Sequence, residues 1–398
     1  MPPPPADDGR DGPVLSLRSV DALASVGRQA WDAVANPPDA EYDPFLSWDF
    51  LEALEASACV GGETGWIPRH LVVEDEQGRL AGALPLYVKS HSMGEYVFDH
   101  AWADAFERAG GQYYPKLLTA VPFSPVTGRR ILAREPGLRR ALAAGAVQTA
   151  QQWGVSGWHV NFPLAAEWRE LGELGLLQRT DRQFIWTNRG YETYEDFLAD
   201  LSSRKRKALR KERREAQAGI AIERLSGDDL HPHHWDAFFA CYRDTGSRKW
   251  GYPYLNREFF DLLHQRLADK VVLVMAKADG RYIAAALNLA GSNALYGRYW
   301  GRLADHPFLH FELCYHQAID IAIERGLGRV EAGAQGEHKL ARGYRPQPVY
   351  SAHFIANDGF RDAVAGFLSR ERAAVEADIA LQDLESPFKS DLKGGDTP

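Results

Sequence analysis

The sequence predicts an α+β fold of two tandem lobes, each a mixed, mostly antiparallel sheet flanked by helices. Residues 69–89 and 270–290 both carry two apolar runs separated by an acidic turn that contains glycine, which is the pattern of a β-hairpin. Each hairpin is followed along the chain by a helical stretch, a glycine and a short apolar strand, over 138–162 and 311–333. This repeated order, about 200 residues apart, indicates a duplicated unit.

The chain of 398 residues is long enough for two domains of ordinary size. We expect a disordered, proline-rich leader at 1–13, a first lobe at 14–185, a second lobe at 186–385 and a flexible polar tail at 386–398. The two copies share negligible identity, so one larger mixed domain is the alternative.

The composition is that of a globular protein, with 45% hydrophobic and 25% charged residues. A net charge of −8 argues against nucleic-acid binding over the whole surface, although a local basic patch is compatible with it. The three cysteines, Cys59, Cys241 and Cys314, form neither a disulfide framework nor a metal-binding spacing, which predicts a reducing, cytoplasmic location. No apolar run is long enough to span a membrane, and the N-terminus lacks the features of a signal peptide.

Further elements follow from helical spacing and from capping and breaking residues. In the first lobe the pattern predicts helices over 20–35 and 45–58, the second capped by Ser47. Prolines interrupt the apolar run 113–131, so we expect a strand there at an edge or a bulge of the sheet. In the second lobe, the spacing over 231–245 predicts a helix rich in aromatic side chains.

A strongly basic helix is predicted over 202–216. Eight of the eleven residues 204–214 are basic and one is acidic. Arg204, Arg206 and Arg210 are therefore expected to bind the phosphates of an anionic carrier such as coenzyme A, a nucleotide diphosphate or tRNA. The alternative is a solvated charged surface with no ligand.

Several segments carry a resemblance to a known family. The runs SSRKRKALRKERREAQAGIAI and RVEAGAQGEHKLARGY resemble the basic helix and the closing strand of the Fem-type peptidoglycan aminoacyltransferases and their FemAB-like relatives. Strings resembling an uncharacterised bacterial branch of these predicted N-acyltransferases are DPFLSWDFLEALE, YYPKLLTAVPFSPVTG, RTDRQFIWTNRGY, YRDTGSRKWGYPYL and YGRYWG…PFLHFELCYHQAID, and the likeness covers about residues 42–372.

The resemblance implies two acetyltransferase-like (GNAT) lobes with the site near their junction. The resemblance brings no characterised substrate. We expect acyl-CoA or aminoacyl-tRNA as a co-substrate rather than a tightly bound cofactor, and a precursor substrate with phosphate groups as a partner. Lys339 matches the lysine of the Fem-like pattern. The glycine signature with which simple acetyltransferases bind the coenzyme A pyrophosphate is not found, and the nearest loop is SPVTGRR at 124–130.

The stretch 296–350 concentrates the reactive side chains of the chain. Glu312 and His316 are four residues apart and are expected on one helical face, with Cys314 and Tyr315 on the opposite, core-facing stripe. The first lobe has no comparable group of histidines and acids in its corresponding segment. We therefore expect the chemistry in the second lobe.

Acyl transfer to an amine requires a base that removes a proton from the attacking nitrogen. Glu312 is the first candidate, His310 the second, and Glu331 a further base or the partner of an arginine. Alternatively, Glu312 is only a charge favoured near a helix start, since Pro307 would lie in the first turn. His306, His310 and His316 would not share one regular helix, so no metal site is predicted.

Two further segments are predicted to bind the substrate or an anion. The glycine-rich turn 333–345 offers donors for an acyl oxygen or a phosphate, and the loop 246–251 combines cations with a ring. Ordinary surface turns and aromatic packing are the alternatives, as they are for the strand aromatics Tyr299 and Trp300, which we expect to line the cleft between the lobes. The residues concerned are Gln335, His338, Lys339, Arg345, Arg248, Lys249, Trp250 and Tyr299.

The sequence thus predicts an N-acyltransferase that transfers an acyl or aminoacyl group from a thioester or ester directly to an amine, with an envelope or peptidoglycan precursor as an expected acceptor. No covalent enzyme intermediate is expected, because Cys59 and Cys241 have no visible histidine and carboxylate arrangement and Cys314 lies on the expected core stripe. A non-catalytic binding protein for a phosphorylated precursor, and an RNA-binding regulator acting through the basic helix, are the alternatives. The acceptor and the oligomeric state stay open.

Overall fold

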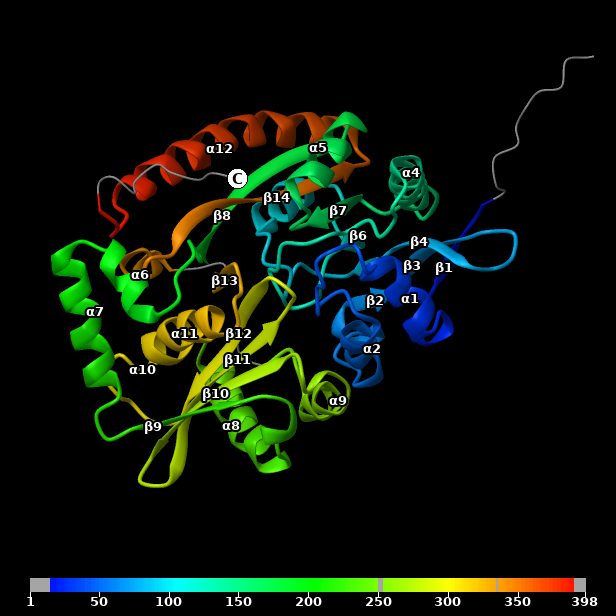
Figure 1. Ribbon diagram of the computed structural model, residues 1–398. Helices are drawn as coiled ribbons and strands as arrows, with labels where there is room; N and C mark the ends of the chain where they lie inside the picture. The colour runs from blue at the N-terminus through cyan, green and yellow to red at the C-terminus, as the bar shows by residue number, and fades with distance from the viewer. Residues whose placement is uncertain (1–14, 250–252, 334–335, 390–398) are drawn as a thin grey trace, which may run out of the picture.

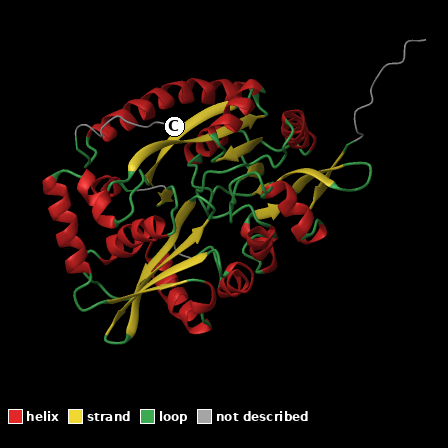
Figure 2. Cartoon of the chain, viewed as in Figure 1, coloured by secondary structure: helices red, strands yellow, loops and turns green. Residues whose placement is uncertain are grey.

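The structure, a computed structural model, describes residues 15–249, 253–333 and 336–389. The predicted leader at 1–13 lies outside the described residues, as do Trp250, Gln335 and 390–398. Figures 1 and 2 show an arrangement of strands covered by helices on both faces, with the long helix α12 lying along the top of the view, above β8 and β14.

The strands form two sheets. The smaller has the order β1-β3-β4, and the larger has the order β2-β5-β6-β7-β14-β8-β13-β12-β11-β10-β9. The strands are β1 (Ser16–Val20), β2 (Trp66–Pro68), β3 (His70–Glu74), β4 (Leu80–Leu84), β5 (Tyr87–Lys89), β6 (Lys116–Thr119), β7 (Gly157–Asn161), β8 (Leu177–Thr187), β9 (Ala221–Leu225), β10 (Val271–Ala278), β11 (Arg281–Ala290), β12 (Ala294–Arg302), β13 (Arg329–Glu331) and β14 (Arg345–Ile355).

The helices lie on both faces of these sheets. They are α1 (Arg28–Ala35), α2 (Trp48–Ala56), α3 (His100–Arg108), α4 (Pro136–Gln152), α5 (Ala165–Glu173), α6 (Tyr194–Asp200), α7 (Ser203–Ala216), α8 (Pro232–Lys249), α9 (Arg257–Leu267), α10 (Leu309–Phe311), the π-helix η4 (Glu312–His316), α11 (Gln317–Glu324), the 3₁₀ helix η5 (Glu337–Arg342) and α12 (Asp358–Leu384).

The predicted duplication is confirmed by the topology. Each lobe contains one parallel strand pair joined by a helical crossover: β6 and β7 through α4, and β12 and β13 through α10, η4 and α11. The predicted hairpins are β3–β4 and β10–β11, both antiparallel. The lobes also interlock, because β14 pairs with β7 of the first lobe and β8 pairs with β13 of the second. The predicted boundary at 185 therefore falls inside β8.

The second-lobe sheet is buried on both faces. Leu273 points into a core with α8 and α9, and its neighbour Val274 points into a core with α11. Neighbouring residues of a strand face opposite sides, so both kinds of position must be apolar in a sheet covered twice. The first of these cores also contains Trp31 and Phe50 of the first lobe, so the two lobes share it.

Several predicted elements differ from the structure. The stretch 20–35 is not one helix, because Gly27 adopts a φ of 81° and separates a short 3₁₀ helix, Leu23–Ser25, from the α-helix Arg28–Ala35. The strand within 113–131 is β6, which lies between β5 and β7 instead of at an edge, since its flanking prolines fall outside the four paired residues. The helix over 45–58 and its Ser47 cap are confirmed. The first residues of the predicted tail are packed: Phe388 is buried against α6, and the N–H of Lys389 donates to Asp200.

Candidate active site

The second parallel pair opens into a cleft. Pairing between β12 and β13 ends at Tyr296 and Glu331, after which the two chains diverge. A cavity of about 710 Å³ lies in this opening, lined by Gly297–Trp300 on one side and by Ala332 and η5 on the other. Residues 92–100 of the first lobe also line it, so the cleft lies between the lobes.

A β-bulge places an arginine at this cleft. Leu287 pairs with Tyr299 while its neighbour Asn288 pairs with Gly297, so Arg298 is the extra residue on β12. Bulges re-aim side chains and occur often beside active sites. The Asn288 amide donates to the Val272 carbonyl at 3.1 Å, and its Oδ1 is buried without a hydrogen-bond partner.

The side chain of Arg298 is buried, and two of its three guanidinium nitrogens lack a hydrogen-bond partner. Its side chain is 2% exposed, its Nε and Nη2 lack hydrogen-bond partners, and its guanidinium is 3.7 Å from the Glu331 carboxylate. The rings of Phe45 and Tyr296 flank it, and burial lowers its pKa. The sequence reasoning missed this arginine. The signal was present in YGRYWG, because a glycine inside a strand pattern is typical of a bulge.

Lys339 reaches the same cleft from η5. It is 2% exposed, and its Nζ donates to the Gly333 carbonyl at 2.8 Å. Burial lowers its pKa to about 7, with Arg298 adding to the lowering. An ammonium has three N–H donors, so two remain for a ligand. Lys339, a predicted site residue, therefore lines the cavity, and its charged and neutral forms are both populated near neutral pH.

The predicted histidines His310 and His338 line the cleft as well. The His310 ring packs against Trp300 at 5.0 Å and against Tyr315 at 5.4 Å between ring centroids. The Tyr315 hydroxyl is 2.9 Å from Nε2 of His338. Tyr299 also lines the cavity, as predicted, and its hydroxyl donates to the Phe123 carbonyl at 3.0 Å.

The segment Glu312–His316 is a π-helix, and this decides which side chains face the cleft. A π-turn carries more residues than an α-turn and so rotates the residues that follow. Glu312 and His316 do share a face, as expected, but both are fully buried towards α7. Cys314, predicted in the core, is partly buried against the second-lobe core and also lines the cavity. The prediction holds only in part, because regular α-helical spacing does not apply across the π-helix.

Glu312 connects the crossover to the basic helix. Its carboxylate accepts hydrogen bonds from Arg213 at 3.2 Å, Gln217 at 2.8 Å and Gln317 at 2.6 Å. Arg213 also pairs with Asp320 at 2.6 Å. A carboxylate with this many partners is suited to holding α7 in place, and the structure does not bring it to the cavity lining.

The predicted anion-binding residues of α7 lie apart from the cavity lining. Leu209 anchors the helix, and Arg204 is exposed. Arg206 donates to the Ala199 carbonyl at 3.5 Å, and Arg210 pairs with Glu195. The helix therefore presents a cationic outer surface, and phosphate binding by it stays a prediction.

Four other predicted residues either do not line the cavity or do not lie in the predicted loop. Glu331 lies on β13 with 3% exposure, where Arg329 donates to it at 3.1 Å. Arg345 begins β14 and pairs with Asp383 at 2.6 Å. Arg248 and Lys249 belong to the end of α8, so the loop predicted over 246–251 is wrong up to residue 249.

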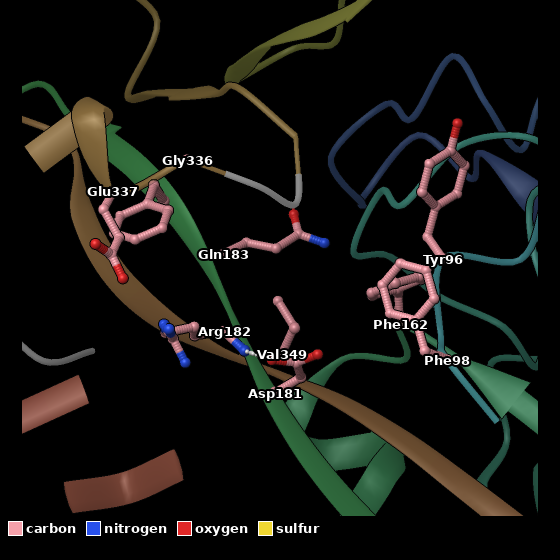
Figure 3. Close-up of a pocket in the computed structure, with 10 residues that line it drawn as sticks. Tyr96, Phe98, Phe162, Asp181, Arg182, Gln183, Gly336, Glu337 and Val349 are labelled. Atoms are coloured by element: carbon pink, nitrogen blue, oxygen red, sulfur yellow. Dashed lines mark hydrogen bonds between the residues drawn. The ribbon is translucent and has the colours of Figure 1, made fainter. Parts of the chain in front are cut away.

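A second, smaller cavity of about 250 Å³ adjoins the cleft. Tyr96, Phe98 and Gly336 line both cavities. Figure 3 shows this side cavity between the rings of the first lobe and the strands at the middle of the sheet. Its remaining lining residues are Phe162, Asp181, Arg182, Gln183, Phe184, Glu337 and Val349.

The first lobe carries a buried ionic network beside the cleft. Lys116 is fully buried, pairs with Glu95 at 2.8 Å and with Asp99, and donates to Ser92 at 2.8 Å. The two carboxylates offset the desolvation of Lys116 and raise its pKa. Ser92 lines the cleft, so the network lies directly behind its wall.

Within residues 15–249, 253–333 and 336–389, no three histidine, cysteine, aspartate or glutamate side chains are grouped to hold a metal ion. No helix in the same ranges has the length and apolar character of a membrane-spanning segment.

Comparisons with known proteins agree with this architecture. The fold is similar to that of FemX, with 13% identity, a TM-score of 0.53 and coverage of 85% of this chain and 98% of FemX. It is also similar to the C-terminal domain of a putative lysylphosphatidylglycerol synthetase from Agrobacterium fabrum, with 10% identity, a TM-score of 0.51 and coverage of 89% and 98%.

A conserved protein of unknown function from Bacteroides thetaiotaomicron has a TM-score of 0.52 at 10% identity, with 85% of this chain and 99% of that protein covered. No curated protein matches the sequence. The two tandem GNAT-like lobes predicted from the sequence are confirmed. A family profile described as peptidoglycan biosynthesis/recognition matches residues 22–390, and the chain therefore belongs to the FemAB-like family, whose fold supports acyltransferase activity.

Proposed function

We propose that the protein is an N-acyltransferase that forms an amide in the cleft of its second lobe, using an acyl-CoA or an aminoacyl-tRNA as donor and an amine of an envelope or peptidoglycan precursor as acceptor. The observation that carries the proposal is the position of Lys339, a buried cation on the open side of a splayed parallel pair. A preorganised donor of this kind stabilises the oxyanion of acyl transfer.

The proposed reaction joins the acceptor nitrogen directly to the acyl carbon. The ammonium loses one proton to solvent, and its nitrogen then attacks the carbonyl carbon of the thioester or ester. His310 takes the second proton as the C–N bond forms, while Lys339 donates to the oxyanion. The C–S or C–O bond then breaks, and His310 returns its proton to the leaving sulfur or oxygen. His310 is favoured as the base because it lines the cleft, whereas Glu312 does not.

The donor is expected to carry phosphates. The exposed cations of α7 suit a polyphosphate or a nucleic-acid backbone, and Arg298 lies at the floor of the cleft as a further cation. Arg298 is proposed to keep the electrostatic potential at the acyl group positive. The rings of Phe45 and Tyr296 exclude water from its guanidinium.

The test is a donor screen with purified protein. Acetyl-CoA, longer acyl-CoAs and aminoacyl-tRNA are each supplied with a mixture of amine acceptors, and new amides are detected by mass spectrometry. We expect one donor class to give product, and His310→Gln to lose turnover at an unchanged melting temperature. Glu312→Gln should instead lower the melting temperature, because it weakens the docking of α7. Loss of turnover by Glu312→Gln with unchanged stability would assign the base to Glu312. Absence of product with every donor would overturn the proposal.

A further inference from the structure

The long helix α12 has one face that is anchored to the sheet and one that is exposed. On the anchored face Leu368 is buried, and Glu371 pairs with Arg179 of β8 at 2.7 Å. Two turns further on, Asp378 pairs with Arg182 of the same strand at 2.5 Å. Figure 1 shows α12 over β8 and β14, at the outer surface of the molecule. These ion pairs fix the rotation of the helix about its own axis, so the opposite face is held towards solvent.

The exposed face of α12 is mostly apolar. Phe367 is 42% exposed and Leu381 is 63% exposed, and the exposed positions between them are mainly alanines. The exposed charged side chains between residues 363 and 381 are Arg370 and Glu376. A helix surface that faces water normally carries charged and polar side chains along its whole length. The composition of this face therefore indicates a surface that a partner covers.

The apolar positions follow the spacing of a seam between two helices. Successive members of the stripe are four, three, four, three and four residues apart: Ala363, Phe367, Arg370, Ala374, Ala377 and Leu381. This is the a/d repeat of a coiled coil, which keeps one stripe of a helix facing a partner helix. Arg370 is the polar member of the stripe, and a single polar residue at such a position fixes the alignment of the two helices.

The stripe is complementary to itself when two copies run antiparallel. With a two-fold axis at the middle of the stripe, Phe367 lies opposite Ala377 of the second copy, and Leu381 lies opposite Ala363 of the second copy. Each large side chain then meets a small one, which fills the seam without voids. A parallel pair would set Phe367 against Phe367 and Ala363 against Ala363, so large side chains would crowd at one level and leave a gap at another.

The charges of α12 favour the same arrangement. Residues 358–372 contain three acidic and three basic side chains, whereas residues 373–388 contain four acidic side chains and no basic one. Arg370 and Glu376 form no salt bridge within the part of the chain that the structure describes. In the antiparallel pair, Arg370 of each copy lies about 3 Å along the axis from Glu376 of the other. A parallel pair would place the two acidic segments side by side.

Other occupants of this face fit less well. Residues 390–398, which follow α12 and lie outside the described chain, contain a single large apolar residue, Leu392, and so cannot cover the stripe. An anionic membrane or a nucleic acid would be repelled by the acidic second half of the helix. A second copy of the chain offers an apolar stripe of the same length and an arginine for each acidic segment.

We infer that two copies of this chain associate through the outer faces of α12, packed antiparallel, with Phe367 and Leu381 as the anchoring side chains. A seam from residue 363 to residue 381 is about 27 Å long. It buries less than the roughly 1,200 Å² at which standard interfaces begin, so the dimer is weak, with a dissociation constant on the order of 10 µM. The inference does not depend on the proposed function, because the described residues that line the two cavities include none from α12.

Sedimentation velocity of the full chain, from about 1 µM to about 200 µM, tests the association. The weight-average mass should rise from that of a monomer towards that of a dimer. Leu381→Glu places a charge in the seam and should raise the dissociation constant about 10-fold or more. Leu303→Glu makes the same change at an exposed leucine directly after β12 and is the matched control, which should leave the association unchanged. Both variants should keep the melting temperature of the wild type, since both leucines are exposed.

Crosslinking of cysteine variants with 1,2-bis(maleimido)ethane tests the direction of the pair. In the antiparallel pair, Ala374→Cys brings two cysteines within about 6 Å along the axis, whereas Ala363→Cys keeps them about 27 Å apart. A covalent dimer should therefore form with Ala374→Cys and neither with Ala363→Cys nor with the wild type, which controls for the native cysteines. Equal crosslinking through both positions would contradict the antiparallel seam.

Two further results would overturn the dimer. One is a chain that stays monomeric at the highest concentration, or that associates equally as wild type and as Leu381→Glu. The other is a monomer that binds phosphatidylcholine vesicles and loses this binding in Leu381→Glu, because the outer face of α12 would then be a surface for lipid.

Discussion

The two parallel strand pairs have the same topology, but the space beyond the first pair is filled and the space beyond the second is an open cleft. Beyond β6 and β7 the gap is filled: Arg130 is fully buried and donates to the Asn161 carbonyl at 2.8 Å and to the Val126 carbonyl. Gly128 bridges to Pro163 beside it. Beyond β12 and β13 the chains diverge around the cleft. The loop nearest to a coenzyme A signature, 124–130, is thus the segment that closes the first lobe.

Lys116 of the first lobe and Lys339 of the second, both buried, show the same contrast. Lys116 has two carboxylate partners, and its pKa is raised. Lys339 donates to a carbonyl, and burial lowers its pKa to about 7. A buried cation with anionic partners is a structural element, whereas one that lacks a paired charge is costly to the fold and typical of a functional site. Under the proposed function, the first copy of the duplicated unit holds a structural lysine and the second copy a functional one.

Replacing the paired lysine should have the largest effect on stability. Lys116→Met leaves Glu95 and Asp99 buried without their cation, so we expect a loss of about 4 kcal/mol in the free energy of unfolding. Urea unfolding measures it. Lys89→Met is the control, because burial already lowers the pKa of Lys89 to about 7 and its charge is less needed. Equal losses of unfolding free energy in Lys116→Met and Lys89→Met would contradict the structural role assigned to Lys116.

Replacing the cleft lysine should affect catalysis instead. Lys339→Met removes the donor to the oxyanion, so kcat should fall by about 10²–10³-fold. The unfolding midpoint should be equal to or above that of the wild type, because a desolvated ammonium is removed. A variant that unfolds easily but turns over normally would show that Lys339 is structural, like Lys116.

The two proteins of the previous experiment should also differ in pH dependence. The folded pKa of Lys339 is about 7, and the unfolded value is about 10.4, so between these values only the unfolded chain holds the proton. Wild-type stability should therefore rise with pH relative to Lys339→Met, by about 2 kcal/mol from pH 7 to pH 9. The measurement is urea unfolding at each pH, and a constant difference would exclude the lowered pKa.

The smallest effect on stability is expected on the outer surface of α7. Exposed charges contribute little to folding, so Arg204→Ala/Lys207→Ala/Lys211→Ala should change stability by less than about 0.5 kcal/mol. If the donor is tRNA, its binding should weaken and the salt slope should fall by about one for each lost phosphate contact. Filter binding at several salt concentrations measures this, and an unchanged slope would leave the helix as a solvated surface.

Local elements of this structure could be predicted from the sequence, whereas features that depend on contacts between distant segments could not. Hairpins and helices follow from spacing and turn residues. Density of reactive side chains in one stretch singled out four residues that line the cleft: Lys339, His338, His310 and Tyr299. The orientation of Glu312 towards α7 could not be predicted, because the apolar spacing of the sequence does not indicate a π-helix. The first-lobe lining of both cavities depends on how the lobes interlock, which no local pattern encodes.

The central claim is that the acyl donor occupies the second-lobe cleft, and Cys314 allows it to be tested directly. Cys314 lines the cleft and is partly exposed, whereas Cys59 and Cys241 are buried and serve as internal references. The measurement is the rate of iodoacetamide alkylation at each cysteine, followed by mass spectrometry with and without the active donor. We predict that the donor slows alkylation of Cys314 at least 10-fold at saturation and leaves the other two unchanged. Alkylation of Cys314 at the same rate with saturating donor, in an enzyme that stays active once alkylated, would contradict the assignment of the site.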